Sequence, residues 1–308
     1  MEADVKAIVF DEFGGPDVLR LRDVEEPHPA ADQIRILVRA AGVNPMDWKI
    51  RNGWVQQMMP TTFPAIPGLE VAGVVDEIGD SVTGFTVGDE VVGWSLTGSY
   101  AQYAIAGVIA PKPAGVAWDE AVAIPVAGNA AQRGLDLVDL REGETLLLHG
   151  AAGAVGSVAV QLAVARGATV IGTASPANHD YVRSLGAVPL TYGDGLVDRV
   201  RDVAPQGVDA VFDVAGKGAL PDSIELRGGT TERIVTIADM DAEKYGVVFT
   251  AGGMSDEERR DVLLRHLGLA AERALRTQVA HTYPLAEAAK AQQTSEAGHV
   301  RGKLVIAP

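Results

Sequence analysis

Residues 145–175 contain the pattern that most constrains the fold of this chain. An apolar segment at 145–148 precedes Gly150, Gly153 and Gly156, and a segment with helical periodicity then leads to a second apolar segment at 169–173. Glycines at this spacing allow a sharp turn and a close approach to the backbone, because no Cβ stands in the way. Strand, glycine turn, helix and strand in this order predict the first half of a dinucleotide-binding unit. The strict Gly-x-Gly-x-x-Gly form is not met, since its first glycine falls on Ala151.

The middle of the chain continues this alternation. Apolar segments predict strands at 145–148, 169–173, 188–190, 210–213 and 233–237. Amphipathic segments between them predict helices at 155–166, 178–185, 196–203 and 219–226. A strand–helix repeat of this spacing predicts a doubly wound parallel sheet covered by helices.

The first third of the chain has a different pattern, with short β-type segments separated by glycine and proline. We expect strands at 5–10, 33–41, 73–78, 90–93 and 100–104, and a mostly β, barrel-like domain over residues 1–118. The last part predicts a strand at 247–249, helices at 255–274 and 285–296, and strands at 278–283 and 302–307.

Composition excludes several classes of protein. The 308 residues suggest two domains, and the absence of cysteine excludes disulfides, iron–sulfur clusters and thiolate zinc sites. The formal net charge of −15 argues against nucleic acid and anionic membranes as partners. We see neither a signal peptide nor an apolar run long enough to span a bilayer, so we expect a cytoplasmic protein.

The end of the second strand indicates which dinucleotide is preferred. NAD sites usually place an acid there to bind the ribose hydroxyls, but residues 172–179 contain none, and Asp180 lies beyond Pro176. Donors suited to a 2′-phosphate stand there instead, which favours NADPH; they are Thr173, Ser175, Asn178, His179 and the more distant Arg183. Helix capping by Ser175 or Asn178 is the alternative.

Five motifs in order resemble the zinc-free quinone oxidoreductase branch of the medium-chain dehydrogenase/reductase superfamily. They are residues 41–53, 67–75, 84–91, 150–156 and 302–306. The resemblance implies a GroES-like catalytic domain at 1–118 and 251–308, and a Rossmann dinucleotide-binding domain at 119–250. It also implies a homodimer formed through the edge strand at 247–249.

The resemblance also bears on metal. Leu69 stands where zinc enzymes of the superfamily carry a histidine, and the six histidines are scattered without metal-ligand spacing. We therefore predict a site without metal.

The resemblance implies a set of cofactor-binding positions. They are Asn129 near the nicotinamide; Gly150, Gly153, Ala154 and Val155 beneath the pyrophosphate; Ser175, His179 and Tyr192 near the 2′-phosphate; and Ala215, Ile237, Ala238 and Lys303. A strand-end aromatic in the core is the alternative for Tyr192, and a solvated lysine is the alternative for Lys303.

The implied activity is hydride transfer from NADPH to a quinone or an α,β-unsaturated carbonyl. Asn44, Asp47, Trp48 and Tyr100 are the candidate catalytic residues, and core packing is the alternative for Tyr100. Trp54, Met58 and Met59 are candidates for an apolar rim around a flat substrate, or for ordinary packing. Two other functions stay open: an enoyl reductase acting on a thioester or polyketide intermediate, and a low-turnover NADPH-binding module.

Overall fold

The computed structural model describes residues 4–308 and divides into two compact units. The first unit consists of Met1–Val126 with Asp256–Pro308, and the second of Ala127–Ser255. In the described part of the chain, no helix combines the length and the apolar character needed to cross a membrane. The two units differ in architecture, and each is built from the segments that its local sequence pattern favours.

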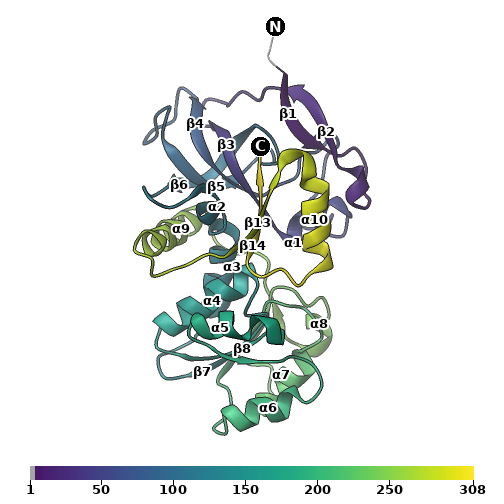
Figure 1. Cartoon of the computed structure of the whole chain (residues 1–308), viewed down its shortest axis with the longest axis vertical. Coiled ribbons are helices and arrows are strands. Elements are labelled where there is room, and N and C mark those ends of the chain that lie inside the picture. The colour runs from purple at the N-terminus through teal and green to yellow at the C-terminus, as the bar shows by residue number, and fades with distance from the viewer. Residues whose placement is uncertain (1–3) are drawn as a thin grey trace. The chain divides into compact units, whose positions relative to one another are not determined.

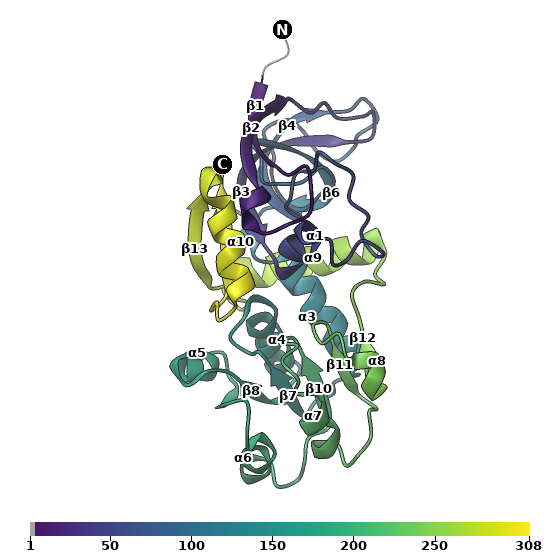
Figure 2. The ribbon, with the colours of Figure 1, turned by 90° about the vertical axis from the view of Figure 1, so that its right-hand side faces the viewer.

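The second unit is built on a six-stranded sheet in the order β12-β11-β10-β7-β8-β9, and every neighbouring pair is parallel. Figure 2 shows β8, β7, β10 and β11 side by side. The strands are β7 (Thr145–His149), β8 (Thr169–Thr173), β9 (Val188–Leu190), β10 (Ala210–Asp213), β11 (Ile234–Thr236) and β12 (Val248–Phe249). The chain runs outward from β7 in one direction and from β10 in the other, so the sheet has a topological switch point between them.

Helices connect these strands. They are α3 (Pro125–Leu137), α4 (Ala154–Ala165), η2 (Pro176–Asn178), α5 (His179–Ser184), α6 (Leu196–Val203), α7 (Leu220–Leu226) and α8 (Ala242–Tyr245). All five residues of β7 are buried, as expected for a central parallel strand covered on both faces. Gly134 of α3 lies against Phe212 of β10, and a Cβ there would stand 2.1 Å from the ring.

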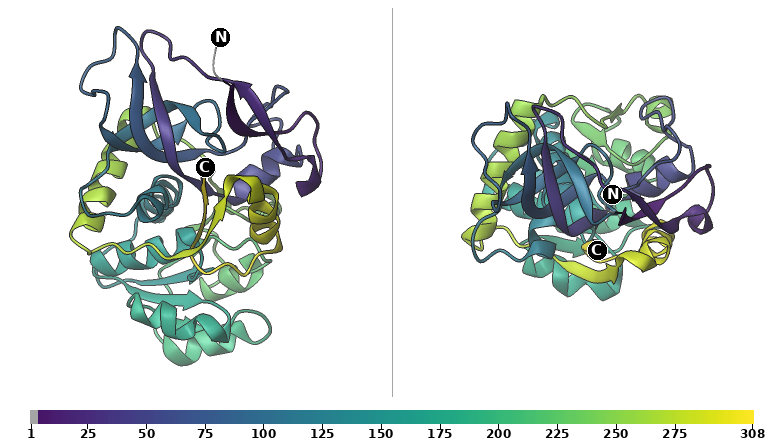
Figure 3. Two further views of the ribbon diagram at one scale, coloured as in Figure 1. Left: turned by 45° about the horizontal axis from the view of Figure 1, so that its top comes forward. Right: turned by 90° about the horizontal axis from the view of Figure 1, so that it is seen from above.

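The first unit contains a curved sheet with the order β13-β14-β3-β4-β5-β6, in which β13 and β14 are parallel and every other neighbouring pair is antiparallel. An additional pairing between β3 and β6 closes β3 to β6 into a small barrel, visible in Figures 1 and 3. The strands are β3 (Ile34–Val43), β4 (Glu70–Ile78), β5 (Glu90–Ser95), β6 (Tyr103–Pro111), β13 (Val279–Pro284) and β14 (Lys303–Ala307). A separate two-stranded sheet joins β1 (Asp4–Val9) and β2 (Arg20–Glu25).

The helical segments of the first unit are η1 (Pro16–Val18), α1 (Pro45–Arg51), α2 (Trp118–Val122), α9 (Asp256–Ala271), η3 (Leu285–Glu287) and α10 (Ala288–Ala297). One apolar cluster fills the barrel and includes Ile36, Val71 and Ile306. A second cluster joins α9 to the outside of the barrel through Leu263 and Leu267. The residues of both clusters are buried, so the polar groups among them need internal hydrogen-bond partners.

The predicted fold class is confirmed: a Rossmann-type parallel sheet is joined to a barrel-like β domain. The strands expected at 169–173, 188–190 and 210–213 have the predicted bounds. The strand expected at 100–104 instead spans Tyr103–Pro111, because the Tyr100 N–H is hydrogen-bonded to Pro67 O outside the ladder. The helix expected at 285–296 begins as a 3₁₀ turn, and α1, α2 and α3 were not expected as helices.

Candidate functional site

The glycine turn of the second unit connects β7 to the start of α4 by a sharp change of direction. Gly150 has a φ of +82°, and Gly153 is the N-cap of α4 without a side-chain capping bond. A Cβ on Gly156 would stand 2.1 Å from Gly150 O, whereas one on Gly153 would approach only Gly150 O, at 3.5 Å. Gly156 is therefore required for packing, while Gly153 borders open space. The first N–H groups of α4 lack intrahelical partners and suit phosphate oxygens.

The turn is held from behind by the end of β8. The Gly150 N–H donates to Thr173 Oγ1 (3.3 Å), and the Ala151 N–H donates to Thr173 O (3.0 Å). The Thr173 hydroxyl also lies 3.3 Å from His149 Nδ1, and His149 Nε2 lies 3.0 Å from Ser223 Oγ. Burial lowers the pKa of His149, so its ring is neutral and can hydrogen-bond to both the Thr173 and the Ser223 hydroxyl. Thr173 is thus buried support for the turn.

The other residues expected near the 2′-phosphate gather where β8 and β9 end. Thr173 pairs with Leu190 in the parallel ladder, which places the segments after them next to each other. Asn178 Nδ2 donates to Ser175 Oγ (3.2 Å), and His179 Nε2 lies 3.4 Å from Thr191 Oγ1.

Tyr192 follows β9 and is 48% exposed, which disfavours the alternative that it packs in the core. Asp180 and Arg183 both lie on α5, where the exposed carboxylate of Asp180 forms an ion pair with the Arg183 guanidinium.

The ends of β10 and β11 form the other side of the switch point. The Asp213 carboxylate is fully buried and accepts the N–H groups of Ala215 (2.9 Å) and Gly216 (3.1 Å) as well as the Thr236 hydroxyl (2.8 Å). A Cβ on Gly216 would stand 2.4 Å from Ala238 O. One carboxylate therefore fixes the two strand-end loops that carry Ala215, Ile237 and Ala238. Sequence reasoning gave Asp213 no role, although its place at the end of an apolar strand was a usable signal.

Asn129 lies in a polar cluster of the second unit. Arg133 Nη1 donates to Asn129 Oδ1 (2.9 Å), and Arg133 Nε donates to Thr250 Oγ1 (2.9 Å). Asn129 Nδ2 lies 2.9 Å from Met254 Sδ. The arginine thus fixes the orientation of the Asn129 amide. Sequence reasoning missed Arg133, because α3, on which it stands one turn after Asn129, was not expected as a helix.

A buried polar network lies behind α1 in the first unit. Asp47 Oδ2 accepts the Asn44 N–H (2.7 Å) and the Tyr100 hydroxyl (3.1 Å). Burial raises the pKa of Asp47 to about 7, and burial also raises the pKa of Tyr100. Asp47 and Tyr100, two of the candidate catalytic residues, are therefore in direct contact inside the unit.

Asn44 connects this network to a buried ion pair. Its Nδ2 donates to Glu70 Oε1 (2.9 Å), and Lys303 Nζ donates to its Oδ1 (2.6 Å). Lys303 also pairs with Glu70, whose other oxygen accepts the Val126 N–H (2.9 Å). Lys303 is 2% exposed, which excludes a solvated side chain. Its ammonium pairs with Glu70 and donates a hydrogen bond to Asn44. The expected contact of Lys303 with the cofactor stays a prediction.

The aromatic residues near α1 are more accessible. Trp48 and Trp54 are in edge-to-face contact with ring centroids 5.5 Å apart, and Trp54 is 65% exposed. The Trp48 indole N–H is buried and makes no hydrogen bond within residues 4–308. Lys49 Nζ lies 5.7 Å from the Trp48 ring centroid. Met58 is half exposed, so Trp54 and Met58 together leave apolar surface in contact with solvent.

Comparisons with known proteins agree with this architecture. Residues 30–128 match the family model described as the alcohol dehydrogenase GroES-like domain, and residues 185–306 match the one described as zinc-binding dehydrogenase. The quinone oxidoreductase structure from Coxiella burnetii is 32% identical, covers 99% of this chain and all of its own, and superposes with a TM-score of 0.87.

The chain belongs to the quinone oxidoreductase branch of the medium-chain dehydrogenase/reductase superfamily. A 2-methylene-furan-3-one reductase from Solanum lycopersicum is 31% identical over 82% of this chain and 67% of its own length. A mycobacterial protein solved as a complex with NADPH is 28% identical, covers 98% of this chain and all of its own, and has a TM-score of 0.85. As a member of this branch, the protein is an oxidoreductase that uses a nicotinamide cofactor and a small-molecule substrate.

Zinc-dependent dehydrogenases of this superfamily carry a metal-binding histidine at the position that is Leu69 in this chain. Leu69 is half-buried between Gly68 and Glu70. Within residues 4–308, no three His, Cys, Asp or Glu side chains are grouped so that they could hold a metal ion. The polar centre of the first unit consists of hydrogen-bonded amide, carboxylate, ammonium and phenol groups.

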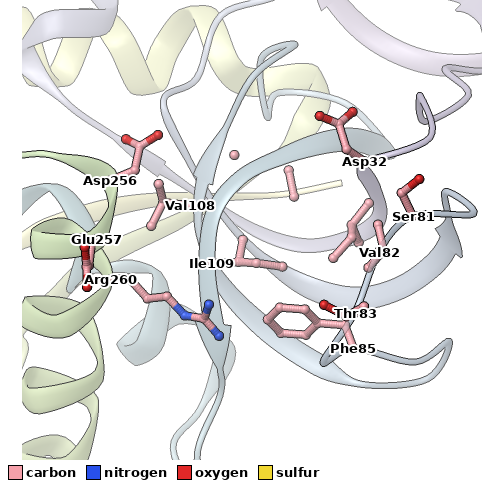
Figure 4. A pocket seen from close by; sticks show the side chains of 13 residues that line it. Asp32, Ser81, Val82, Thr83, Phe85, Val108, Ile109, Asp256, Glu257 and Arg260 are labelled. Atoms are coloured by element: carbon pink, nitrogen blue, oxygen red, sulfur yellow. The ribbon is translucent and has the colours of Figure 1, made fainter.

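A hollow of about 490 Å³ in the first unit, shown in Figure 4, is lined by no residue of this polar centre. It is lined by β6, by the turn before β5 and by the start of α9, and Arg260 lies over the Phe85 ring at 5.8 Å. None of the candidate catalytic or cofactor-binding residues lines it. We therefore assign no catalytic role to this hollow.

Proposed function

We propose that the protein transfers hydride from NADPH to a quinone or an α,β-unsaturated carbonyl. The observation that carries the proposal is the second unit's glycine turn, followed by a strand end with Ser175, Asn178 and His179 and no acid. An acid there would repel a 2′-phosphate, whereas hydroxyl, amide and imidazole groups can donate to it. The NADPH complex of the mycobacterial relative supports the same cofactor.

The residues of the second unit fit a dinucleotide. Gly153, Ala154 and Val155 would receive the pyrophosphate at the start of α4, and Ser175, Asn178, His179 and Tyr192 would surround the 2′-phosphate. Ala215, Ile237, Ala238 and Asn129 would lie along the remainder of the molecule. The bound cofactor supplies the hydride, and the protein binds and orients the acceptor and excludes water from it.

The first unit supplies the groups that would handle the acceptor. Trp48 and Trp54 offer aromatic surface to a flat molecule, while the buried contacts of Asp47 and Asn44 hold α1 in place. Asp47 and Tyr100 hydrogen-bond to each other, so we assign them a positioning role and leave the final proton to water. The tomato relative, named as a reductase of an unsaturated ketone, supports enones as acceptors beside quinones.

The test is a panel of quinones, enals and enoyl thioesters with NADPH, followed through the nicotinamide absorbance. We expect consumption of NADPH with quinones or simple enones and slower turnover with enoyl thioesters. Faster turnover with thioesters would identify an enoyl reductase. Tight NADPH binding without turnover of any acceptor would contradict the enzymatic proposal and indicate a binding module.

A further inference from the structure

Helix α1 is fixed through one face, which leaves Lys49 on the other. Asp47 and Arg51 are buried and share a face, because residues four apart align along a helix. Arg51 donates to Gly14 O (2.9 Å), to Gln292 Oε1 (2.9 Å) and to Glu296 Oε2 (2.8 Å), which ties α1 to α10. Lys49 lies midway between Asp47 and Arg51 in sequence, so its side chain leaves the helix on the opposite side.

Lys49 is a half-buried cation without a counter-charge. Within residues 4–308, its ammonium forms no ion pair or hydrogen bond, and its charged group is placed only against the Trp48 ring. Burial lowers the pKa of Lys49. The chain has 41 acidic residues and 26 basic ones, so carboxylates are abundant, yet none of those within residues 4–308 pairs with this ammonium. Removing a charge from water without a partner is unfavourable, and a bound anion would reverse that cost.

The surroundings of Lys49 are aromatic and partly open. The Trp48 and Trp54 rings meet at 89°, and the Trp54 N–H donates to Lys49 O (3.0 Å), which holds the turn after α1 against the helix. Trp54 is 65% exposed and Met58 is 50% exposed. Aromatic rings beside a cation suit a ligand with a flat ring and a negative charge.

We propose that Lys49, Trp48 and Trp54 form a subsite for a flat acceptor that carries a carboxylate or sulfonate group. The ring of the acceptor lies against the indoles, and its anionic group pairs with the ammonium of Lys49. A net charge of −15 repels anions from the surface, so a local cation decides whether such an acceptor binds. The identification of the ligand as an acceptor rests on the proposed function, whereas the subsite itself rests on these three side chains.

The test uses two ligands that cannot be reduced by hydride and differ only in charge, 2-naphthoate and 2-naphthamide. Their dissociation constants are measured by quenching of tryptophan fluorescence in the full chain and in the variants Lys49→Met, Lys49→Arg and Trp54→Ala. Lys244→Met is the matched control, because Lys244 is exposed and also stacks on an aromatic ring, Tyr245, at 5.1 Å. Both methionine variants change the net charge equally.

We expect Lys49→Met to reduce the preference for naphthoate over naphthamide about tenfold, as for the loss of one hydrogen bond to a charged group. Lys49→Arg should retain most of the preference, and Lys244→Met should leave it unchanged. Trp54→Ala should weaken the binding of both ligands. The proposal is overturned if Lys49→Met and Lys244→Met change the preference equally, or if neither ligand binds the unmodified protein. Circular dichroism checks that each variant is folded.

Failure of the subsite and failure of the proposed function can be told apart. A parallel assay compares NADPH oxidation with a neutral naphthoquinone and with its sulfonate. If neither is reduced but naphthoate binding depends on Lys49, the subsite stands and the hydride-transfer proposal fails. If both are reduced with rates whose ratio is unaffected by Lys49→Met, the subsite fails and the hydride-transfer proposal stands.

Discussion

Asp47 has been almost removed from water by the fold. Its Oδ2 receives two hydrogen bonds, from the Asn44 N–H and the Tyr100 hydroxyl, whereas its Oδ1 is buried and has no partner within residues 4–308. Burial is the main reason that its pKa is raised from the ordinary value of 3.8 to about 7. The folded protein therefore holds a proton on Asp47 over a pH range in which the unfolded chain has lost it.

The first prediction concerns the dependence of stability on pH. Because the folded pKa of Asp47 is raised, its contribution to stability is full below about pH 4 and is lost as the pH rises through about 7. The shift corresponds to a loss on the order of 4 kcal/mol. Asp47→Asn keeps an acceptor oxygen but cannot titrate, so its free energy of unfolding should fall less over this range. Urea denaturation at several pH values measures it.

A control for Asp47→Asn is Asp180→Asn, which removes one carboxylate whose side chain is 98% exposed. This control should retain the pH dependence of the unmodified protein. Equal slopes for the unmodified protein and Asp47→Asn would show that Asp47 titrates similarly in the folded and unfolded states, contrary to its burial.

The second prediction concerns the choice of cofactor. Ser175→Asp should weaken NADPH binding about tenfold or more and change NADH binding little, because a carboxylate repels the 2′-phosphate and replaces a donor to it. Titration of both cofactors by fluorescence measures the two affinities. Ser184→Asp, an exposed serine at the far end of α5, is the control. Equal weakening of NADPH and NADH would refute the assigned phosphate pocket.

The unit of strand β7, glycine turn and helix α4 is the element on which the proposed cofactor site depends. Its glycines differ in what an added side chain would contact. A Cβ on Gly156 would clash with Gly150 O, whereas a Cβ on Gly153 would not. The sequence pattern alone treats the two positions alike, because spacing does not show what each missing side chain would touch. The structure therefore separates a glycine that packing requires from one at which a Cβ would meet no clash.

The third prediction uses this difference. Gly156→Ala should lower the stability of the cofactor-free protein by about 1–3 kcal/mol through overpacking against Gly150. Gly153→Ala has no such clash, so it should leave stability within about 1 kcal/mol but weaken NADPH binding, because its methyl group occupies the approach to the backbone. Thermal unfolding and NADPH titration measure the two effects. Equal destabilisation by both changes would contradict the distinction.

Elements with a strong local pattern were predicted well, whereas helix α1 was not predicted from the sequence. Seven residues with a proline at the first position and alternating polar and apolar side chains give little helical periodicity. The helix forms because Asp47 bonds the Asn44 N–H at its start and Arg51 bonds α10 at its end. Gln292 and Glu296, the partners of Arg51, lie more than two hundred residues away in the sequence. A pattern read from neighbouring residues therefore cannot reveal these contacts.

At the scale of the whole molecule, the β12 edge of the parallel sheet is a candidate surface for a second copy of the chain. Strand β12 pairs only with β11 among the described strands, and Val248 is 53% exposed and Phe249 36% exposed. An unpaired apolar edge strand is a template for pairing with another strand. We therefore retain the homodimer through residues 247–249 as a proposal.

The fourth prediction tests this assembly. Val248→Lys should convert a dimer into a monomer in sedimentation analysis, because a charged side chain disfavours pairing at the edge strand. Val203→Lys, on an exposed valine of α6, is the control and should remain dimeric. A monomeric unmodified protein, or a dimer that persists with Val248→Lys, would rule out this interface.

The sequence by itself determined the parallel sheet, the glycine turn and the family, because strand and helix periodicity and glycine spacing are local properties. It did not determine the partners of Asp47, Tyr100 and Lys303. Lys303 bonds Asn44 across 259 positions, and Tyr100 bonds Asp47 across 53. Buried polar groups must find partners wherever the fold brings them, so only the tertiary structure decided that these residues form one network and that Lys49 stands outside it.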